Sequence, residues 1–307
     1  MDKPFYGGQA VLEGVMMRGR RHMAVAVRAP EGNIVVHDEA LTSAIYTSRW
    51  SRWPFIRGAI ALWDSLVLGT RVLMFSANVA VGEAAGGLEA ASGAIWLTVL
   101  FSLALATALF FVLPVLLVGV VDTYLRSSFL SNLVEKVFRL TLIVGYIGFV
   151  GFLPDIKRVF AYHGAEHKAV NAYEDGAPLE VAAVARYSTA HPRCGTAFLL
   201  VVVVVSFAAF LLLGQPPLLW RIASRIVLIP IVAGVAYELI RLGGKHRRHP
   251  VVKVLLAPGM ALQALTTREP DSAQLEVAIS ALKRVVALEE EAEEGAVLSA
   301  PAVPAVS

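Results

Sequence analysis

The stretch Ala94–Val121, AIWLTVLFSLALATALFFVLPVLLVGVV, decides the fold class because it contains no charged residue. It is longer than the roughly 20 apolar residues that a helix needs to cross the hydrocarbon core of a bilayer. Three further apolar runs qualify as spans: Val137–Leu153, Ala197–Gly214 and Ile222–Ile240. The sequence therefore predicts a mainly α, polytopic helical membrane protein with four spans, two of them kinked at Pro114 and Pro230.

The composition agrees with this prediction. Of the 307 residues, 57% are hydrophobic, and the mean hydropathy is +0.65, whereas soluble domains are about 45–50% apolar. A net charge of only +3 is weak support for nucleic-acid binding, so no nucleic-acid partner is expected. The single cysteine excludes an internal disulfide framework. The first residues contain no apolar run, so no cleavable signal peptide is expected.

Residues 1–57 are expected to be a soluble segment that contains a β-hairpin. Two β-rich runs, Met23–Arg28 and Asn33–His37, flank the turn residues Pro30-Glu31-Gly32. Residues 58–93 are expected to form an amphipathic helix and a linker, because charges such as Asp64 and Arg71 are costly at the centre of a lipid-facing span.

The rest of the chain divides at the apolar runs. Residues 94–153 hold the first two spans, 154–196 a cytoplasmic His/Cys loop, 197–240 the last two spans, 241–294 a basic segment and a C-terminal amphipathic helix, and 295–307 a disordered tail. In the C-terminal helix Asp271 is the expected N-cap, with Gln274 as its capping-box partner. A small cytoplasmic α+β portion is expected to assemble from the N-terminal segment, the loop 154–196 and the C-terminal helix.

The distribution of Lys and Arg predicts the orientation. Of the 27 basic residues, 22 lie on one side of the predicted spans and five on the other. Since basic residues concentrate in cytoplasmic segments, both termini and the His/Cys loop are predicted to be cytoplasmic, in the cytoplasmic (inner) membrane of a bacterium. The expected partners are the lipid bilayer and other proteins at the cytoplasmic face. The basic segment that begins at Arg241 anchors at head groups or binds anionic lipid specifically.

The motif His163-Gly-Ala-Glu166-His167 carries the chemical hypothesis. The two histidines are four positions apart, which places them on one face of a helix, and Glu166 flanks that face. This H-x-x-E-H order is that of inverted zinc hydrolases, in which histidines hold the metal and glutamate is the base. Two ordinary histidines on a helix surface are the alternative.

His191 and Cys194 supply two more ligand-type side chains in the same loop. Zinc, or another divalent metal, is the predicted cofactor because imidazole and thiolate suit a borderline-soft ion. Four protein ligands would make the site structural, whereas three ligands with Glu166 as catalytic base would leave an open position. Cys194 is alternatively a nucleophile activated by histidine or a small buried residue.

Four other polar residues are candidates for contacts near the site: Glu13, Arg18, Arg193 and Glu238. A surface salt bridge is the simpler reading of Glu13 and Arg18. Arg193 is a candidate partner for Glu166, a pairing that would argue against Glu166 as a base. Glu238 either reaches the head groups or is buried in the bundle, where it points at the His/Cys loop or at an arginine.

Four blocks together carry a family resemblance: Gly7–Gly19, His163–Lys168, His191–Gly195 and Pro258–Pro270. With them the chain resembles the YqhQ family of bacterial multi-pass membrane proteins, a domain of unknown function often described as predicted metal-dependent enzymes. The resemblance implies a bacterial inner-membrane protein and no particular substrate. The leading hypothesis is a metal-dependent hydrolase at the membrane surface. A metal-stapled scaffold or assembly factor that binds other proteins is the alternative, and a transporter is a third.

Overall fold

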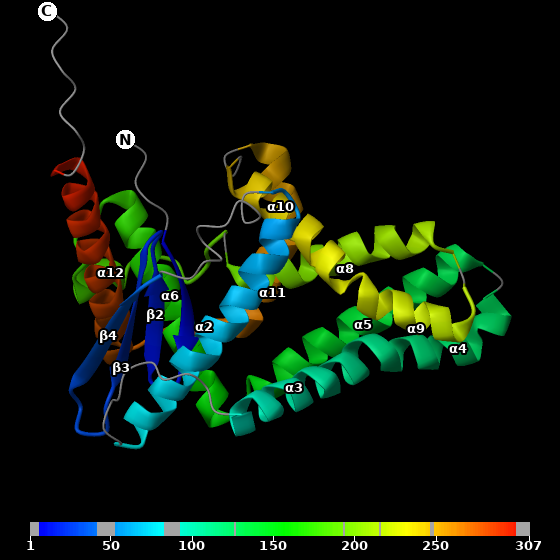
Figure 1. Cartoon of the computed structure of the whole chain (residues 1–307), viewed down its shortest axis with the longest axis horizontal. Coiled ribbons are helices and arrows are strands. Elements are labelled where there is room, and N and C mark those ends of the chain that lie inside the picture. The colour runs from blue at the N-terminus through cyan, green and yellow to red at the C-terminus, as the bar shows by residue number, and fades with distance from the viewer. Residues whose placement is uncertain are drawn as a thin grey trace, which may run out of the picture.

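The computed structural model describes residues 6–41, 53–82, 93–125, 127–192, 194–214, 216–245 and 249–298. A three-layer module of sheet and helices continues into a long helical arm (Figure 1). The strands are β1 (Gly7–Val11), β2 (Gly14–Arg18), β3 (His22–Arg28) and β4 (Ile34–Ala40). They pair antiparallel in sequence order, so β1 and β4 are the edges of the sheet.

The hairpin predicted from Met23 to His37 is confirmed as β3 and β4, with Gly32 at a φ of 93° in the turn. Strands β1 and β2 were not predicted. Their sequence is rich in glycine, which disfavours strands when considered alone. They form because the β2 and β3 side chains are buried on both faces of the sheet, so tertiary packing outweighs local propensity.

Side-chain alternation along the strands explains the three layers. One face packs on α6 (Pro154–Asp175) and α12 (Ser272–Leu298) through residues such as Met17 and Ala24. The opposite face packs on α2 (Ile56–Ala80) through residues such as Met16 and Val25. The sheet is thus the middle layer between α2 and the α6–α12 pair.

Helix α2 is long and apolar enough to cross a membrane by length and composition. Two of its three charged residues nevertheless reach the sheet: Asp64 accepts from Arg18 at 2.6 Å, and Arg71 donates to Glu39 at 3.0 Å. Asp64 and Arg71, whose charges disfavour a lipid-facing span, therefore join α2 to the sheet.

The arm contains the apolar helices. It is built from α3 (Gly93–Thr107), the π-helix η2 (Ala108–Val112), α4 (Leu113–Leu125), α5 (Ser128–Val150), α8 (Gly195–Leu212), α9 (Leu218–Val227) and α10 (Ile229–Lys245). In Figure 1, α4 and α9 lie at the end of the arm farthest from the sheet. The short α7 (Val181–Val184) follows α6, and α11 (Pro250–Thr266), which was not predicted, lies beside α8.

Among the described residues, two helices are long and apolar enough to cross a membrane, Ile56–Ala80 and Gly93–Val121, or up to four if two bent helix pairs each count as one span. The predicted span Ala94–Val121 matches the second of these. The span predicted from Val137 begins earlier, at Ser128, because its first turns carry buried charges that a hydropathy criterion rejects. The predicted span Ile222–Ile240 is divided into α9 and α10, bent by 46° just before Pro230.

The helix is irregular at Pro114, where a kink was predicted: the π-helix η2 ends two residues before this proline, whose nitrogen has no hydrogen to donate. Helix α12 continues to Leu298, past the predicted start of the disordered tail. The capping box is confirmed: the Gln274 N–H donates to Asp271 at 2.8 Å, and the Asp271 N–H donates to Gln274 at 3.0 Å.

Candidate metal centre

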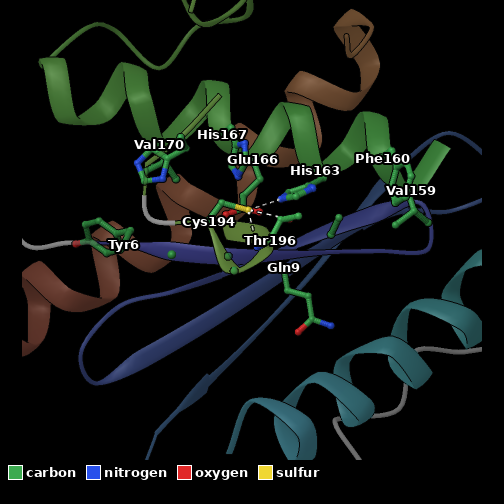
Figure 2. A pocket seen from close by; sticks show the side chains of 15 residues that line it. Tyr6, Gln9, Val159, Phe160, His163, Glu166, His167, Val170, Cys194 and Thr196 are labelled. Atoms are coloured by element: carbon green, nitrogen blue, oxygen red, sulfur yellow. Dashed lines mark hydrogen bonds between the residues drawn. The ribbon is translucent and has the colours of Figure 1, made fainter. Parts of the chain in front are cut away.

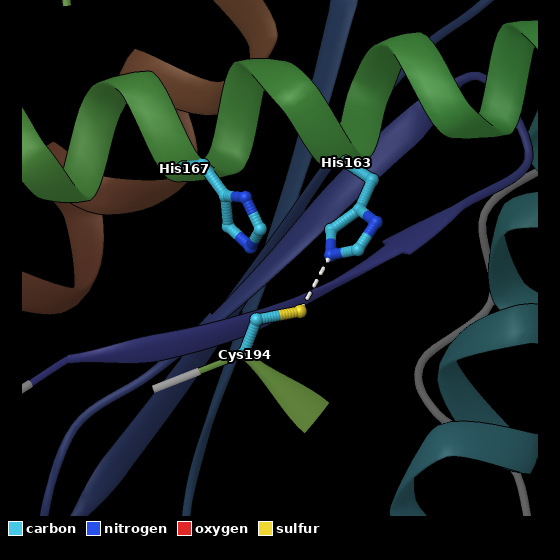
Figure 3. A group of neighbouring side chains, drawn as sticks. All are labelled: His163, His167 and Cys194. Carbon is cyan, nitrogen blue, oxygen red and sulfur yellow. Dashed lines mark hydrogen bonds between the residues drawn. The ribbon is translucent and has the colours of Figure 1, made fainter. Parts of the chain in front are cut away.

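The segment predicted as the His/Cys loop is largely helix α6, and this helix positions the motif. His163 and His167 lie one turn apart with ring centroids 4.4 Å apart. Both rings project toward the sulfur of Cys194, which precedes the first turn of α8 (Figure 3). One ligand atom from each of these three residues lies within 4.8 Å of the others, and Cys194 and His167 are buried.

Backbone carbonyls fix the orientation of both rings. His163 donates from Nδ1 to the Thr266 carbonyl at 2.9 Å, and His167 donates from Nδ1 to the Thr189 carbonyl at 2.5 Å. Because a carbonyl can only accept, the proton of each neutral ring lies on Nδ1 and the Nε2 lone pair is free. Histidines that bind metals are held in this way, by a hydrogen bond from the ring nitrogen that does not bind the metal.

The sulfur of Cys194 faces these nitrogens. It lies 3.2 Å from His163 Nε2, to which the thiol donates a hydrogen bond. Nitrogen and sulfur ligands of a tetrahedral zinc ion lie roughly 3.5 Å apart, given bond lengths of about 2.0 and 2.3 Å. The Thr196 backbone N–H donates to the same sulfur at 3.4 Å. The donor set of two imidazoles and one thiol is therefore one that could hold a divalent metal ion such as zinc.

Glu166 lies beside the cluster. Its carboxylate accepts a hydrogen bond from the backbone N–H of Gly8 in β1, and its side chain lines the same cavity as the histidines (Figure 2). Burial raises the pKa of the Glu166 carboxyl above its ordinary value, and the nearby His163 and His191 partly oppose this rise. A Cβ at Gly8 would lie 2.9 Å from Glu166 Cδ, so the glycine allows this close approach.

His191 lies next to the cluster but is directed elsewhere. Its ring centroid is 5.6 Å from that of His167, and its Nε2 is 3.6 Å from a Glu174 carboxylate oxygen. Gln263 holds the His191 backbone through two hydrogen bonds, of 2.8 and 2.9 Å. The structure thus brings together three of the four predicted ligands and places the fourth beside them.

A cavity of about 360 Å³ opens at the cluster. Four consecutive residues of the edge strand β1, Gly7 to Ala10, line one side, and α6 lines another. Figure 2 shows His163, Glu166, Cys194 and Thr196 grouped along this cavity. The cavity therefore lies between the cluster and the edge of the sheet.

The other polar candidates lie away from the cluster. Glu13, in the β1–β2 turn, forms an ion pair with Arg158 and accepts from the Tyr162 hydroxyl. Arg18 pairs with Asp64, and Glu238 pairs with Arg57, the arginine partner that was one of its two readings. Arg193 lies outside the described residues.

Sequence reasoning missed the backbone partners of the site. The carbonyls of Thr189 and Thr266 carry no sequence signal, because any residue supplies one. Gly8 and Thr266 do fall within the family blocks Gly7–Gly19 and Pro258–Pro270. The fold explains why these blocks go together with the histidine motif: both contact its helix.

Comparison with known proteins identifies the family. Residues 53–288 match the family model described as "Protein of unknown function (DUF1385)". The chain belongs to the DUF1385 family. It is also 37% identical over 299 residues to a Bacillus subtilis (strain 168) protein described as "Uncharacterized protein YqhQ", covering 93% of each chain. No solved structure matches.

The expected resemblance to YqhQ-like proteins is thereby confirmed. The match to the family model contains His163, His167 and Cys194, whereas the β-sheet precedes it. The family carries no assigned activity, so the chemistry must be argued from the site.

Proposed function

We propose that the protein is a metal-dependent hydrolase of the bacterial inner membrane, with His163, His167 and Cys194 as the metal ligands. The observation that carries this proposal is the pair of hydrogen bonds from Nδ1 to backbone carbonyls, which leaves both Nε2 lone pairs beside one sulfur. A divalent ion held there would polarise a substrate carbonyl and activate water.

Three ligands and an adjoining cavity favour a catalytic site over a closed structural one. A closed set would require His191, whose Nε2 lies beside Glu174 instead. Glu166 lines the cavity without belonging to the three-ligand group, which suits a proton acceptor that is not itself a ligand. The scaffold alternative loses its fourth ligand in this arrangement.

The edge strand β1 supports an extended substrate. Backbone groups along the edge of a sheet can pair with a peptide laid beside them. Because Gly7 to Ala10 line the cavity that contains the cluster, a peptide bond held along β1 would reach the ligands. We therefore propose amide bonds of extended peptides as the substrate class.

The proposed setting is the cytoplasmic face of the membrane. The charge asymmetry of 22 to five basic residues supports cytoplasmic termini and a cytoplasmic site. Phosphatase fusions at Ser307 and at Ser128 test this orientation, and phosphatase activity from the Ser307 fusion would contradict a cytoplasmic C-terminus.

Metal analysis of the purified full-length protein tests the site. We expect about one zinc per chain, its loss in His167→Ala and Cys194→Ser, and its retention in Glu166→Gln. His249→Ala, at an exposed histidine before α11, is the matched control. Hydrolysis of quenched fluorescent peptides should disappear in Glu166→Gln. Activity retained by Glu166→Gln would contradict the role of Glu166 as base and would favour the scaffold function instead.

One observation favours a second candidate, a thiol hydrolase. The Cys194 thiol donates to His163 Nε2 at 3.2 Å, a geometry in which histidine can activate a cysteine nucleophile. That reading gives no role to His167, whose Nε2 faces the same sulfur (Figure 3). Peptide hydrolysis by metal-free protein, blocked by alkylation of Cys194, would favour this candidate.

A further inference from the structure

A buried group of charges, which we term the charge cluster, lies in the helical arm. It joins α5 to α9 around the Glu135 carboxylate, which accepts from Arg139 and Arg225 at 2.9 Å, from Lys136 at 3.2 Å and from Arg221 at 3.4 Å. The sequence prediction did not recognise this group, because it treated these residues as flanking or isolated charges.

Positive charge exceeds negative charge in this cluster. Even with Arg221 left aside, three cations surround one carboxylate, and each of these four side chains is at most 5% exposed. The Phe210 ring contacts two of the cations, with its centroid 4.0 Å from the Arg225 guanidinium and 4.3 Å from Lys136 Nζ. Like charges held this close in a poorly solvated region repel one another, and an additional anion would relieve that repulsion.

Arg139 has donors to spare for such an anion. Its Nη2 donates to Glu135 and, at 3.4 Å, to the Phe111 carbonyl. Its Nε and Nη1 atoms are buried, and within the described part of the chain they have no hydrogen-bond partner. Buried donors of a charged group are costly to leave unpaired, so these nitrogens indicate a ligand.

The helices around the cluster are interrupted. The π-helix η2 contains Phe111, whose carbonyl faces Arg139. Helices α9 and α10 break with a bend of 46° shortly after Arg225. Interrupted helices within apolar bundles are characteristic of ligand sites.

Exposed apolar side chains flank the cluster. On α5, Phe129 and Val137 are more than half exposed, as is Trp220, which immediately precedes Arg221 on α9. Tyr124, near the end of α4, is 84% exposed. Aromatic residues of this kind favour the boundary between head groups and acyl chains.

We propose that the charge cluster binds a phosphate group, either the head group of a membrane phospholipid or free inorganic phosphate. The anion would take the N–H groups of Arg139 that lack partners and offset the excess of positive charge. This site is separate from the His/Cys cluster and does not depend on the hydrolase proposal.

Binding measurements on full-length protein, purified in nonionic detergent and freed of lipid, test the wild type. Native mass spectrometry with phosphatidylglycerol, compared with a neutral glycolipid of the same acyl chains, measures the lipid source. Equilibrium dialysis with radiolabelled inorganic phosphate measures the free source. Preference for phosphatidylglycerol supports a lipid ligand, and saturable phosphate binding alone supports the free ion. If the protein shows neither a preference for phosphatidylglycerol nor saturable phosphate binding, the proposal is overturned, and water is the partner of Arg139.

Two variants with opposite expected effects on anion binding test whether the charge cluster is the binding site. Arg139→Gln should weaken it about tenfold or more, since a hydrogen bond from a charged group is lost. Glu135→Gln adds one unit of net positive charge and should tighten it, a gain that misfolding cannot mimic. The control Arg284→Gln removes an exposed arginine paired to Asp38 and should change nothing. Equal binding by wild type and both cluster variants would contradict the proposal, as would a loss in all three variants.

Discussion

The two buried polar clusters of this protein are organised in opposite ways. At the His/Cys cluster, hydrogen bonds to backbone carbonyls orient neutral rings, and a cavity opens beside them. At the charge cluster, full charges crowd around one carboxylate in an apolar arm. A site held by neutral hydrogen bonds can exist without its ligand at little cost, whereas one built from like charges depends on each counter-charge.

The largest expected effect tests this dependence on counter-charge. Glu135→Gln removes the carboxylate shared by four cations and should destabilise the protein by about 3–5 kcal/mol, as when one partner of a buried ion pair is removed. Glu238→Gln is the matched control: its pair with Arg57 is about one-fifth to one-quarter exposed, so a loss of about 1 kcal/mol or less is expected.

Thermal unfolding in phosphate-free detergent measures both variants. Similar losses of stability in the two variants would show that the charge cluster depends on its carboxylate no more than the partly exposed pair of Glu238 and Arg57 does. Added phosphate should restore stability to Glu135→Gln if the site binds that anion.

The two clusters also differ in how far the sequence predicts them. Short spacing on one helix made His163, Glu166 and His167 recognisable, and a nearby segment supplied Cys194. The charge cluster joins Glu135 to Arg225, 90 residues apart, and no local pattern marks such a pairing. Hydropathy found the apolar helices but misplaced the start of α5, because charges buried by α9 lower its average. The strands β1 and β2 escaped notice because their burial depends on α6 and α12, which follow much later in the chain.

The second prediction concerns how closely the three-layer module must pack to hold the His/Cys cluster. Gly164 directly follows His163 in α6. A Cβ at this glycine would lie 2.1 Å from the Arg268 carbonyl oxygen. Gly164→Ala should therefore push α6 away from the segment that carries Thr266 and cost about 1–3 kcal/mol.

Gly145→Ala, in α5 of the arm, is the control, since nothing lies within 4 Å of a Cβ there. It should be neutral or slightly stabilising because alanine favours helix. Thermal unfolding together with zinc content measures the outcome. If Gly164→Ala retained both stability and zinc, close packing of α6 would not be required to orient His163.

The third prediction concerns the N-cap of α12 in the three-layer module. Asp271 caps α12 and exchanges two hydrogen bonds with Gln274. Asp271→Ala should cost about 1 kcal/mol, the usual value for an N-cap. Asp271→Asn, which keeps an accepting oxygen, should cost less. Equal losses in thermal stability for the two variants would show that the carboxylate charge, and not the cap hydrogen bond, is responsible.

The smallest expected effect comes from an exposed ion pair, the counterpart of the buried charges in the arm. Arg158 donates hydrogen bonds to Glu13 and thereby lowers the pKa of that carboxyl below its ordinary value of 4.5. Because the pKa is lower in the folded state, the pair contributes stability above pH 4.5, and this contribution is lost as the pH falls through the lowered value. The Arg158 side chain is 53% exposed, so solvent screening limits the contribution to about 0.5–1 kcal/mol. Arg158→Gln should therefore lower the unfolding temperature slightly at neutral pH and converge with the wild type in acid. A difference between the two proteins that persists below the lowered pKa would assign the effect to packing of the Arg158 side chain rather than to its charge.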